Sequence, residues 1–133
     1  MDAALAAVAQ QCLAATHAGS LGFTAIVGTL IEAGFEGYAV DYRRGAQTFY
    51  LPDGQWLDFP LPDQAGPVAA AFDAATMEAQ IRWAQSGDPA YSYQAFSRHV
   101  TAAGCAGYLV SFPGRRVVYY GRTGEVHIEL FPQ

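Results

Sequence analysis

The chain reads AGCAGYLV at residues 103–110 and AGFEGYAV at residues 33–40. When residues 23–62 are laid on residues 93–132 without a gap, nine positions are identical. About three identities would be expected by chance in a chain so rich in alanine and glycine. We therefore expect an internal repeat within one domain that spans residues 1–133, with halves at about 2–62 and 72–132.

Hydrophobic periodicity and turn residues predict the same order of elements in both halves. Asp2, Asp73 and Ser92 are suitable N-caps, and Gly34 and Gly104 suit the left-handed backbone that ends a helix. Helices are expected at residues 3–16, 23–33, 74–86 and 93–103. Strands are expected at residues 37–43, 47–51, 55–59, 107–112, 115–120 and 125–131. Each half is thus predicted as helix–helix–strand–strand–strand.

The short turns between these strands decide the fold class. A turn such as Pro52-Asp53-Gly54 joins neighbouring strands into a hairpin, so the strands are antiparallel. A three-stranded unit with one apolar face must be covered, and the helices can cover it. We predict an α+β domain in which helices cover antiparallel sheet, built by internal duplication with a pseudo-two-fold axis. One six-stranded sheet and two smaller sheets both remain open.

The repeat breaks its own pattern in the third strand of each half. Leu57 and Phe59 fall opposite His127 and Glu129 when the two halves are aligned. Since a change of one residue in register turns every side chain to the other face, a one-residue slip would restore an apolar inner face. We therefore expect a β-bulge or a longer turn in one half.

Composition narrows the functional classes. Hydrophobic residues make up 52% of the chain and charged residues 14%, which favours a buried protein–protein interface, with an apolar ligand cavity as the alternative. A net charge of −5 argues against a nucleic-acid partner, because binding to phosphates needs a basic surface. Cys12 and Cys105 are too few for a disulfide framework, so free buried thiols are expected.

The N-terminal stretch has no lysine or arginine before Arg43. A secretory signal begins with a positive segment, and no apolar run of this chain approaches the length of a membrane span. We therefore expect a cytoplasmic protein without a membrane partner.

Three runs of the second half, GYLV at 107–110, GRRVVYYGR at 114–122 and GEVHIELFP at 124–132, resemble a small bacterial family of unknown function. Some members of that family are labelled "phage envelope protein". The run GFEGYAVD at 34–41 is similar to the family's N-terminal half, so the resemblance covers roughly residues 22–132. It implies a related fold and a bacterial or prophage setting, with a structural role in a virion as one functional hypothesis. It implies no catalytic residues.

Glu125, His127 and Glu129 alternate along one predicted strand and so share one face. They suggest either a metal or acid–base site, with His99 as a further ligand from a helix, or the solvent face of a terminal strand. We favour the solvent face. In that interpretation the inward side chains are Val126, Ile128 and Leu130.

Arginines form the other charged cluster. Arg115, Arg116 and Arg122 could clamp an anionic group, but cross-strand pairing with Glu125 and Glu129 is the favoured interpretation.

Tyrosine and cysteine are the other residue types that could serve a function. The tyrosines of the predicted strands suit a ligand platform or, as we favour, the core; they are Tyr38, Tyr50, Tyr108, Tyr119 and Tyr120. Cys105 takes the place of Phe35 in the repeat, so it is expected to pack rather than react.

Two functional hypotheses follow. The first is a non-enzymatic cytoplasmic domain that self-associates as a homodimer through its surplus apolar surface. The alternative is a small-molecule-binding protein or simple enzyme with a charged cleft between the halves. The candidate ligand-binding residues are Asp41, Arg116, Arg122, His127 and Glu129. No metal and no cofactor are expected.

Overall fold

The computed structural model describes residues 2–132. Two helices are followed by three strands, twice along the chain. The first set is α1 (Ala3–Ala18), α2 (Phe23–Ala33), β1 (Gly37–Asp41), β2 (Ala46–Tyr50) and β3 (Trp56–Pro60). The second set is α3 (Ala74–Gln85), α4 (Tyr93–Ala102), β4 (Cys105–Ser111), β5 (Arg116–Gly121) and β6 (Val126–Leu130). The predicted order of elements is confirmed.

The helices begin and end next to residues whose chemistry suits a helix cap. The side chains of Asp2, Asp73 and Ser92 each accept a hydrogen bond from a backbone N–H in the first turn of the helix that follows. These bonds satisfy amide groups that have no partner within the helix. Gly34 ends α2 with φ of 103°, a left-handed conformation that glycine adopts without strain. The predicted caps are therefore confirmed.

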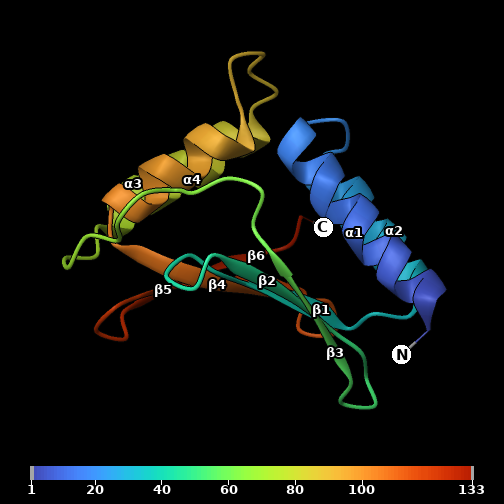
Figure 1. The fold of residues 1–133 in the computed structure, drawn as a ribbon. Coiled ribbons are helices and arrows are strands. Elements are labelled where there is room, and N and C mark those ends of the chain that lie inside the picture. Colours follow the sequence, from blue (N-terminus) through green and yellow to red (C-terminus); the bar gives the residue numbers. More distant parts are fainter. Residues whose placement is uncertain (1, 133) are drawn as a thin grey trace.

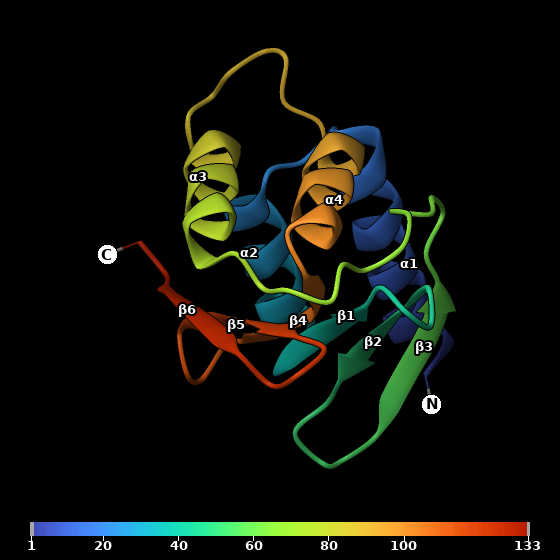
Figure 2. The ribbon, with the colours of Figure 1, turned by 90° about the vertical axis from the view of Figure 1, so that its left-hand side faces the viewer.

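The six strands form one antiparallel sheet in the order β3-β2-β1-β4-β5-β6 (Figures 1 and 2). The open question of one sheet or two is thus settled in favour of one. The two halves join where β1 runs antiparallel to β4, with Gly37 opposite Ser111 and Asp41 opposite Gly107. We call this β1–β4 junction the seam.

All four helices lie on the same face of the sheet, so the other face is bare (Figure 1). The first helix pair and the second helix pair lie apart above the sheet, one on each side. The largest fully buried side chains belong to this single helix–sheet layer: Phe49, Leu30, Met77, Val40, Val100 and Val110. The hydrophobic effect therefore holds the helices onto one face only.

The predicted slip in the third strand is wrong. β2 pairs with β3 through Tyr50↔Trp56, and β5 pairs with β6 through Tyr120↔Val126, so the same register recurs in both halves. The register shift that the second half does contain lies between Cys105 and Gly107, in the pairing of β4 with β5. The polar residues His127 and Glu129 of β6 therefore lie on the face of the sheet that the helices cover.

Candidate functional site

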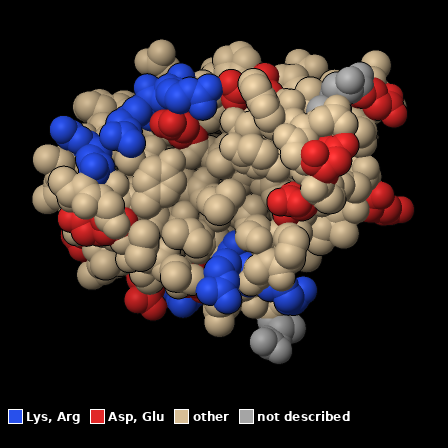
Figure 3. All heavy atoms as spheres, turned by 90° about the horizontal axis from the view of Figure 1, so that it is seen from below, with Lys and Arg blue, Asp and Glu red and all other residues tan. Residues whose placement is uncertain are grey.

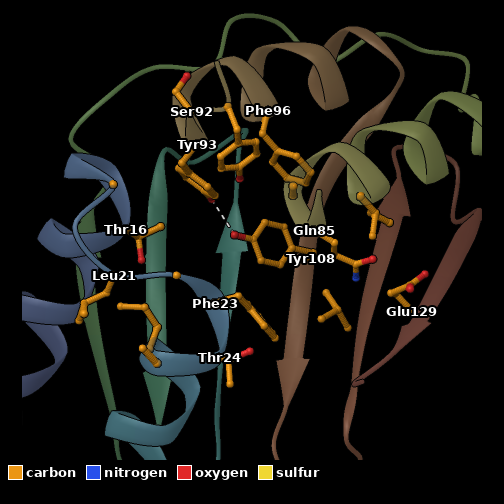
Figure 4. Close-up of a pocket in the computed structure, with 18 of the residues that line it drawn as sticks. Thr16, Leu21, Phe23, Thr24, Gln85, Ser92, Tyr93, Phe96, Tyr108 and Glu129 are labelled. Carbon is orange, nitrogen blue, oxygen red and sulfur yellow. Dashed lines mark hydrogen bonds between the residues drawn. The ribbon is translucent and has the colours of Figure 1, made fainter. Parts of the chain in front are cut away.

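A cleft of about 890 Å³ lies above the sheet, between the two helix pairs (Figure 4). Its lining comes from both halves: the end of α1 and the start of α2 on one side, and the end of α3 and the start of α4 on the other. β1, β4 and β5 contribute the bottom, and β6 with the residues after it contributes one end. Small-molecule sites commonly enclose roughly 300–1,000 Å³, so the cleft has the size of a binding site.

Three tyrosines cover the bottom of the cleft, and we call them the tyrosine floor: Tyr38 on β1, Tyr108 on β4 and Tyr119 on β5. Strand alternation turns all three toward the helices. The Tyr108 hydroxyl lies 2.6 Å from the hydroxyl of Tyr93 on α4, a hydrogen bond in which either group can be the donor. The hydroxyls of Tyr38 and Tyr119 make no hydrogen bond to another residue among residues 2–132. Two phenol groups are therefore free to bond a ligand.

Burial changes the acidity of this floor. Loss of hydration raises the pKa of Tyr38, Tyr108 and Tyr119 above the usual value for a phenol, because a buried phenolate would lose its water. The three side chains are thus neutral at physiological pH. They can donate and accept hydrogen bonds but do not carry charge.

Aromatic side chains form the walls of the cleft. Phe23, in the first turn of α2, meets Phe131 edge to face with ring centroids 5.6 Å apart. Across the cleft, Tyr93 and Phe96 of α4 stack with centroids 6.1 Å apart. Figure 4 shows Phe23, Tyr93, Phe96 and Tyr108 around the hollow. Such surfaces favour flat apolar molecules, which can stack or pack edge-on against them.

A polar cluster lies at the β6 end of the cleft. Register places His127 opposite Tyr119 and Glu129 opposite Val117, so both polar side chains are on the helix-covered face. The guanidinium of Arg82, from α3, donates a 2.8 Å hydrogen bond to Glu129, and Glu129 lines the cleft. His127 Nε2 lies 3.8 Å from the other carboxylate oxygen and is buried without a hydrogen-bond partner in the described part of the chain.

This cluster overturns the favoured interpretation of β6. The solvent-facing side chains are the apolar ones, since Val126, Ile128 and Leu130 are 56%, 47% and 60% exposed. Glu125 is not in the strand and accepts a hydrogen bond from the Thr123 hydroxyl. The physical reason is Arg82, which gives an inward carboxylate a partner and so offsets its desolvation. Arg82 was missed, since no local pattern connects residues 47 positions apart.

The other charged candidates lie outside the cleft. The Asp41 carboxylate accepts hydrogen bonds from the backbone N–H groups of Arg43 and Arg44, in the turn after β1. Arg116 donates to the carbonyl of Gly114, and Arg122 donates to that of Val68.

The predicted pairing of these arginines with glutamates is wrong. Glu129 is bonded to Arg82, Glu125 is bonded to a threonine, and the Arg115 guanidinium lies 5.9 Å from the centroid of the Phe131 ring. Of the five candidate residues, the structure brings Glu129 to the cleft, with His127 beside it.

His17, at the end of α1, is a cleft residue that sequence reasoning missed. Its ring meets Tyr93 edge to face with centroids 4.8 Å apart, and its Nδ1 lies 3.0 Å from an Asp63 carboxylate oxygen. The hydrogen bond with His17 lowers the pKa of the Asp63 carboxyl. Gln94 bonds both the His17 carbonyl and Asp63. This network fixes the position of Tyr93, and no spacing in the sequence indicated it.

The two cysteines have no part in the cleft. Cys12 and Cys105 are free and buried, as predicted. Burial raises the pKa of the Cys105 thiol to about 12, so this thiol stays protonated and unreactive at neutral pH. Within residues 2–132, no three histidine, cysteine, aspartate or glutamate side chains converge as metal ligands would.

No protein-family model matches this chain, and no curated protein matches it closely enough to count as a relative. In the part of the chain that the structure describes, no helix combines the length and the apolar character that a membrane span requires.

Proposed function

We propose that this protein binds a small molecule in the cleft between its two helix pairs. The observation that supports this most directly is a space of about 890 Å³ above the tyrosine floor, where the hydroxyls of Tyr38 and Tyr119 make no hydrogen bond within residues 2–132. Protein interiors are otherwise close-packed, whereas a space of this size holds water against a largely apolar lining. A ligand that fills the cleft releases this water and gains van der Waals contacts with the lining.

We propose that the protein binds this molecule without catalysing a reaction on it. Glu129 is held by Arg82, the floor tyrosines are neutral phenols, and the Cys105 thiol is buried and protonated. A general base or nucleophile has to be free and poised near its reacting atom. The cleft presents hydrogen-bonding groups and apolar walls, which suit recognition.

Filling the cleft from α3 tests this function. Ala84 lines the cleft near the end of α3 and is exposed, so Ala84→Trp places an indole in the cleft without disturbing the core. We expect native mass spectrometry of the gently purified, untagged wild type to show a retained small molecule, and the variant to have lost it. Ala79→Trp is the matched control, since Ala79 is exposed on the same helix but does not line the cleft. Equal retention by both variants would contradict the proposal.

A second function, self-association as a homodimer, is supported by the bare face of the sheet. Seen from below, most of this face is uncharged (Figure 3). Its exposed apolar side chains include Tyr50, Trp56, Leu109, Val126, Ile128 and Leu130. Exposed apolar patches on soluble proteins often mark protein–protein interfaces.

Size and charge make a second copy a suitable partner for this face. Six strands about 4.8 Å apart and five to seven residues long cover roughly 500 Å² in projection. Because side chains protrude from the sheet, the accessible area of this face is larger than its projected area. It approaches the roughly 800 Å² that each partner buries in a stable interface. The charges on the face balance, with Asp41 and Arg116 on it and Asp58 bonded to Arg44 at 2.8 Å. Two identical copies therefore do not repel each other there.

A charge in the middle of that face is expected to prevent dimer formation. Leu109, on the central strand β4, is 41% exposed, and Leu109→Lys would bury an ammonium group against apolar side chains in the dimer. We expect the dimer dissociation constant to rise on the order of 100-fold, measured by analytical ultracentrifugation over a wide concentration range. Ile31→Lys, on the outer side of α2 where Ile31 is 51% exposed, should leave it unchanged. A wild type that is monomeric at every concentration would rule out this function.

The origin and setting of the protein are further proposals. An internal duplication with a pseudo-two-fold axis at the seam is supported by the nine identities and by the recurrence of strand registers at an offset of seventy residues, such as Tyr50↔Trp56 and Tyr120↔Val126. A cytoplasmic location and a prophage setting stay predictions from the sequence.

A further inference from the structure

The chemical class of the ligand follows from the charges around the cleft, on the basis of the proposed binding function. Among the side chains that line it, Glu129 is the one aspartate, glutamate, lysine or arginine, and its carboxylate already accepts a 2.8 Å hydrogen bond from Arg82. A charged ligand would lose hydration on entry without gaining a free counter-ion. The cleft therefore disfavours ions of either sign.

The starts of α2 and α4 both line the cleft, and each would attract an anion. The Ser92 side chain caps α4, whereas Gly22 gives α2 no side-chain cap, so the first-turn amide groups of α2 keep the larger uncompensated partial positive charge. The Glu129 carboxylate, at the β6 end of the same cleft, acts against an anion. A neutral acceptor atom such as a carbonyl or hydroxyl oxygen satisfies the amide groups without this repulsion.

The hydrogen-bonding groups of the tyrosine floor also favour an uncharged ligand. Tyr38 and Tyr119 line the cleft from opposite sides of the seam, on β1 and β5. Their hydroxyls make no hydrogen bond within residues 2–132, whereas the Tyr93 and Tyr108 hydroxyls are hydrogen-bonded to each other. A phenol donates one hydrogen bond and accepts others, which fits one or two uncharged polar atoms on the ligand.

We propose that the cleft binds an uncharged, planar aromatic molecule, packed between the aromatic walls and hydrogen-bonded by Tyr38 and Tyr119. The walls supply the apolar contact on two sides, through Phe23 and Phe131 at one and Tyr93 and Phe96 at the other. The hydroxyls of the floor orient the ring system through its polar atoms. Burial of the apolar ring supplies most of the affinity.

A charge series on one ring system tests this class. The probes are 2-naphthol, which is neutral, 2-naphthoate, which is an anion, and 2-(aminomethyl)naphthalene, which is a cation at neutral pH. Binding is followed by NMR titration of the backbone amides that line the cleft. We expect 2-naphthol to bind on the order of tenfold or more tightly than either charged probe. Equal binding, or tighter binding of a charged probe, would overturn the proposed class and leave the binding function standing. No response to any probe would count against the binding function itself.

Removing two hydroxyls tests the role of the floor. The double variant Tyr38→Phe/Tyr119→Phe keeps both rings, so we expect it to fold and to bind 2-naphthol about fivefold or more weakly. Tyr120→Phe is the matched control, because Tyr120 lies on the bare face of the sheet, opposite Val126, and does not line the cleft. It should bind 2-naphthol as the wild type does. Undiminished binding by the double variant would show that the floor does not recognise the ligand's polar atoms.

Discussion

Gly107→Ala is expected to lower the free energy of unfolding by about 3 kcal/mol or more. A Cβ atom at this position would lie 2.3 Å from the Val40 carbonyl oxygen and 2.4 Å from the Tyr120 hydroxyl. The tyrosine can turn aside, but the carbonyl belongs to β1, the strand paired with β4 across the seam. Relief of the clash therefore requires the two central strands to separate beneath the cleft. Urea denaturation of the variant and the wild type measures the difference.

Two other glycines serve as matched comparisons. Gly37→Ala should cost a similar amount, because its Cβ would lie 2.4 Å from the Val110 carbonyl oxygen on the other side of the seam. Gly28, in the exposed interior of α2, has no atom within 4 Å of an added Cβ. Gly28→Ala should raise the free energy of unfolding by about 0.5–1 kcal/mol, through the higher helix propensity of alanine. A loss below about 1 kcal/mol at Gly107 would show that the seam can relax.

The helices, their caps and the antiparallel strands could be predicted because each depends on local chemistry. Asp2, Asp73 and Ser92 cap the helices that directly follow them. The number of sheets could not be predicted in this way. It depends on the pairing of β1 with β4, for example Val40 with Tyr108, and no turn joins these strands.

The orientation of β6 shows where pattern reasoning fails. Strand alternation with Val126, Ile128 and Leu130 favours an apolar inner face, yet the structure has His127 and Glu129 there. A polar side chain can face inward when another element supplies its partner. That partner, Arg82, comes from a helix far away in sequence. The sequence therefore shows that β6 has His127 and Glu129 where β3 has apolar residues, but it does not show the reason.

The location of the cleft could be predicted from the sequence, but most of the residues that line it could not. A site between the two halves was expected, but its candidate residues were chosen for charge, and Asp41, Arg116 and Arg122 lie elsewhere. The core position expected of the strand tyrosines is correct for Tyr38, Tyr108 and Tyr119, which are buried, and wrong for Tyr50, which is 37% exposed on the bare face of the sheet. One side chain can pack with its ring and present its hydroxyl to a ligand. Composition alone does not separate these two roles.

The second large effect is expected in β6. The double variant His127→Leu/Glu129→Phe gives this strand the side chains that Leu57 and Phe59 provide at the corresponding register positions of β3. We expect the free energy of unfolding to rise by about 1–3 kcal/mol, because replacing a buried polar pair with apolar side chains is often stabilising. The Glu129 side chain is 17% exposed, whereas that of Arg82 is 53% exposed and can turn into water.

Urea denaturation of this double variant decides whether the polar cluster belongs to the site or to the framework. Glu78→Leu is the control: Glu78 also contacts Arg82, at 3.6 Å, but from the exposed side of α3, so its loss should change stability by no more than about 0.5 kcal/mol. A more stable double variant would mean that the cluster is kept despite its cost in stability, as residues of a binding site often are. A less stable one would mean that the bond between Arg82 and Glu129 holds α3 on the sheet, and the cluster would then be structural.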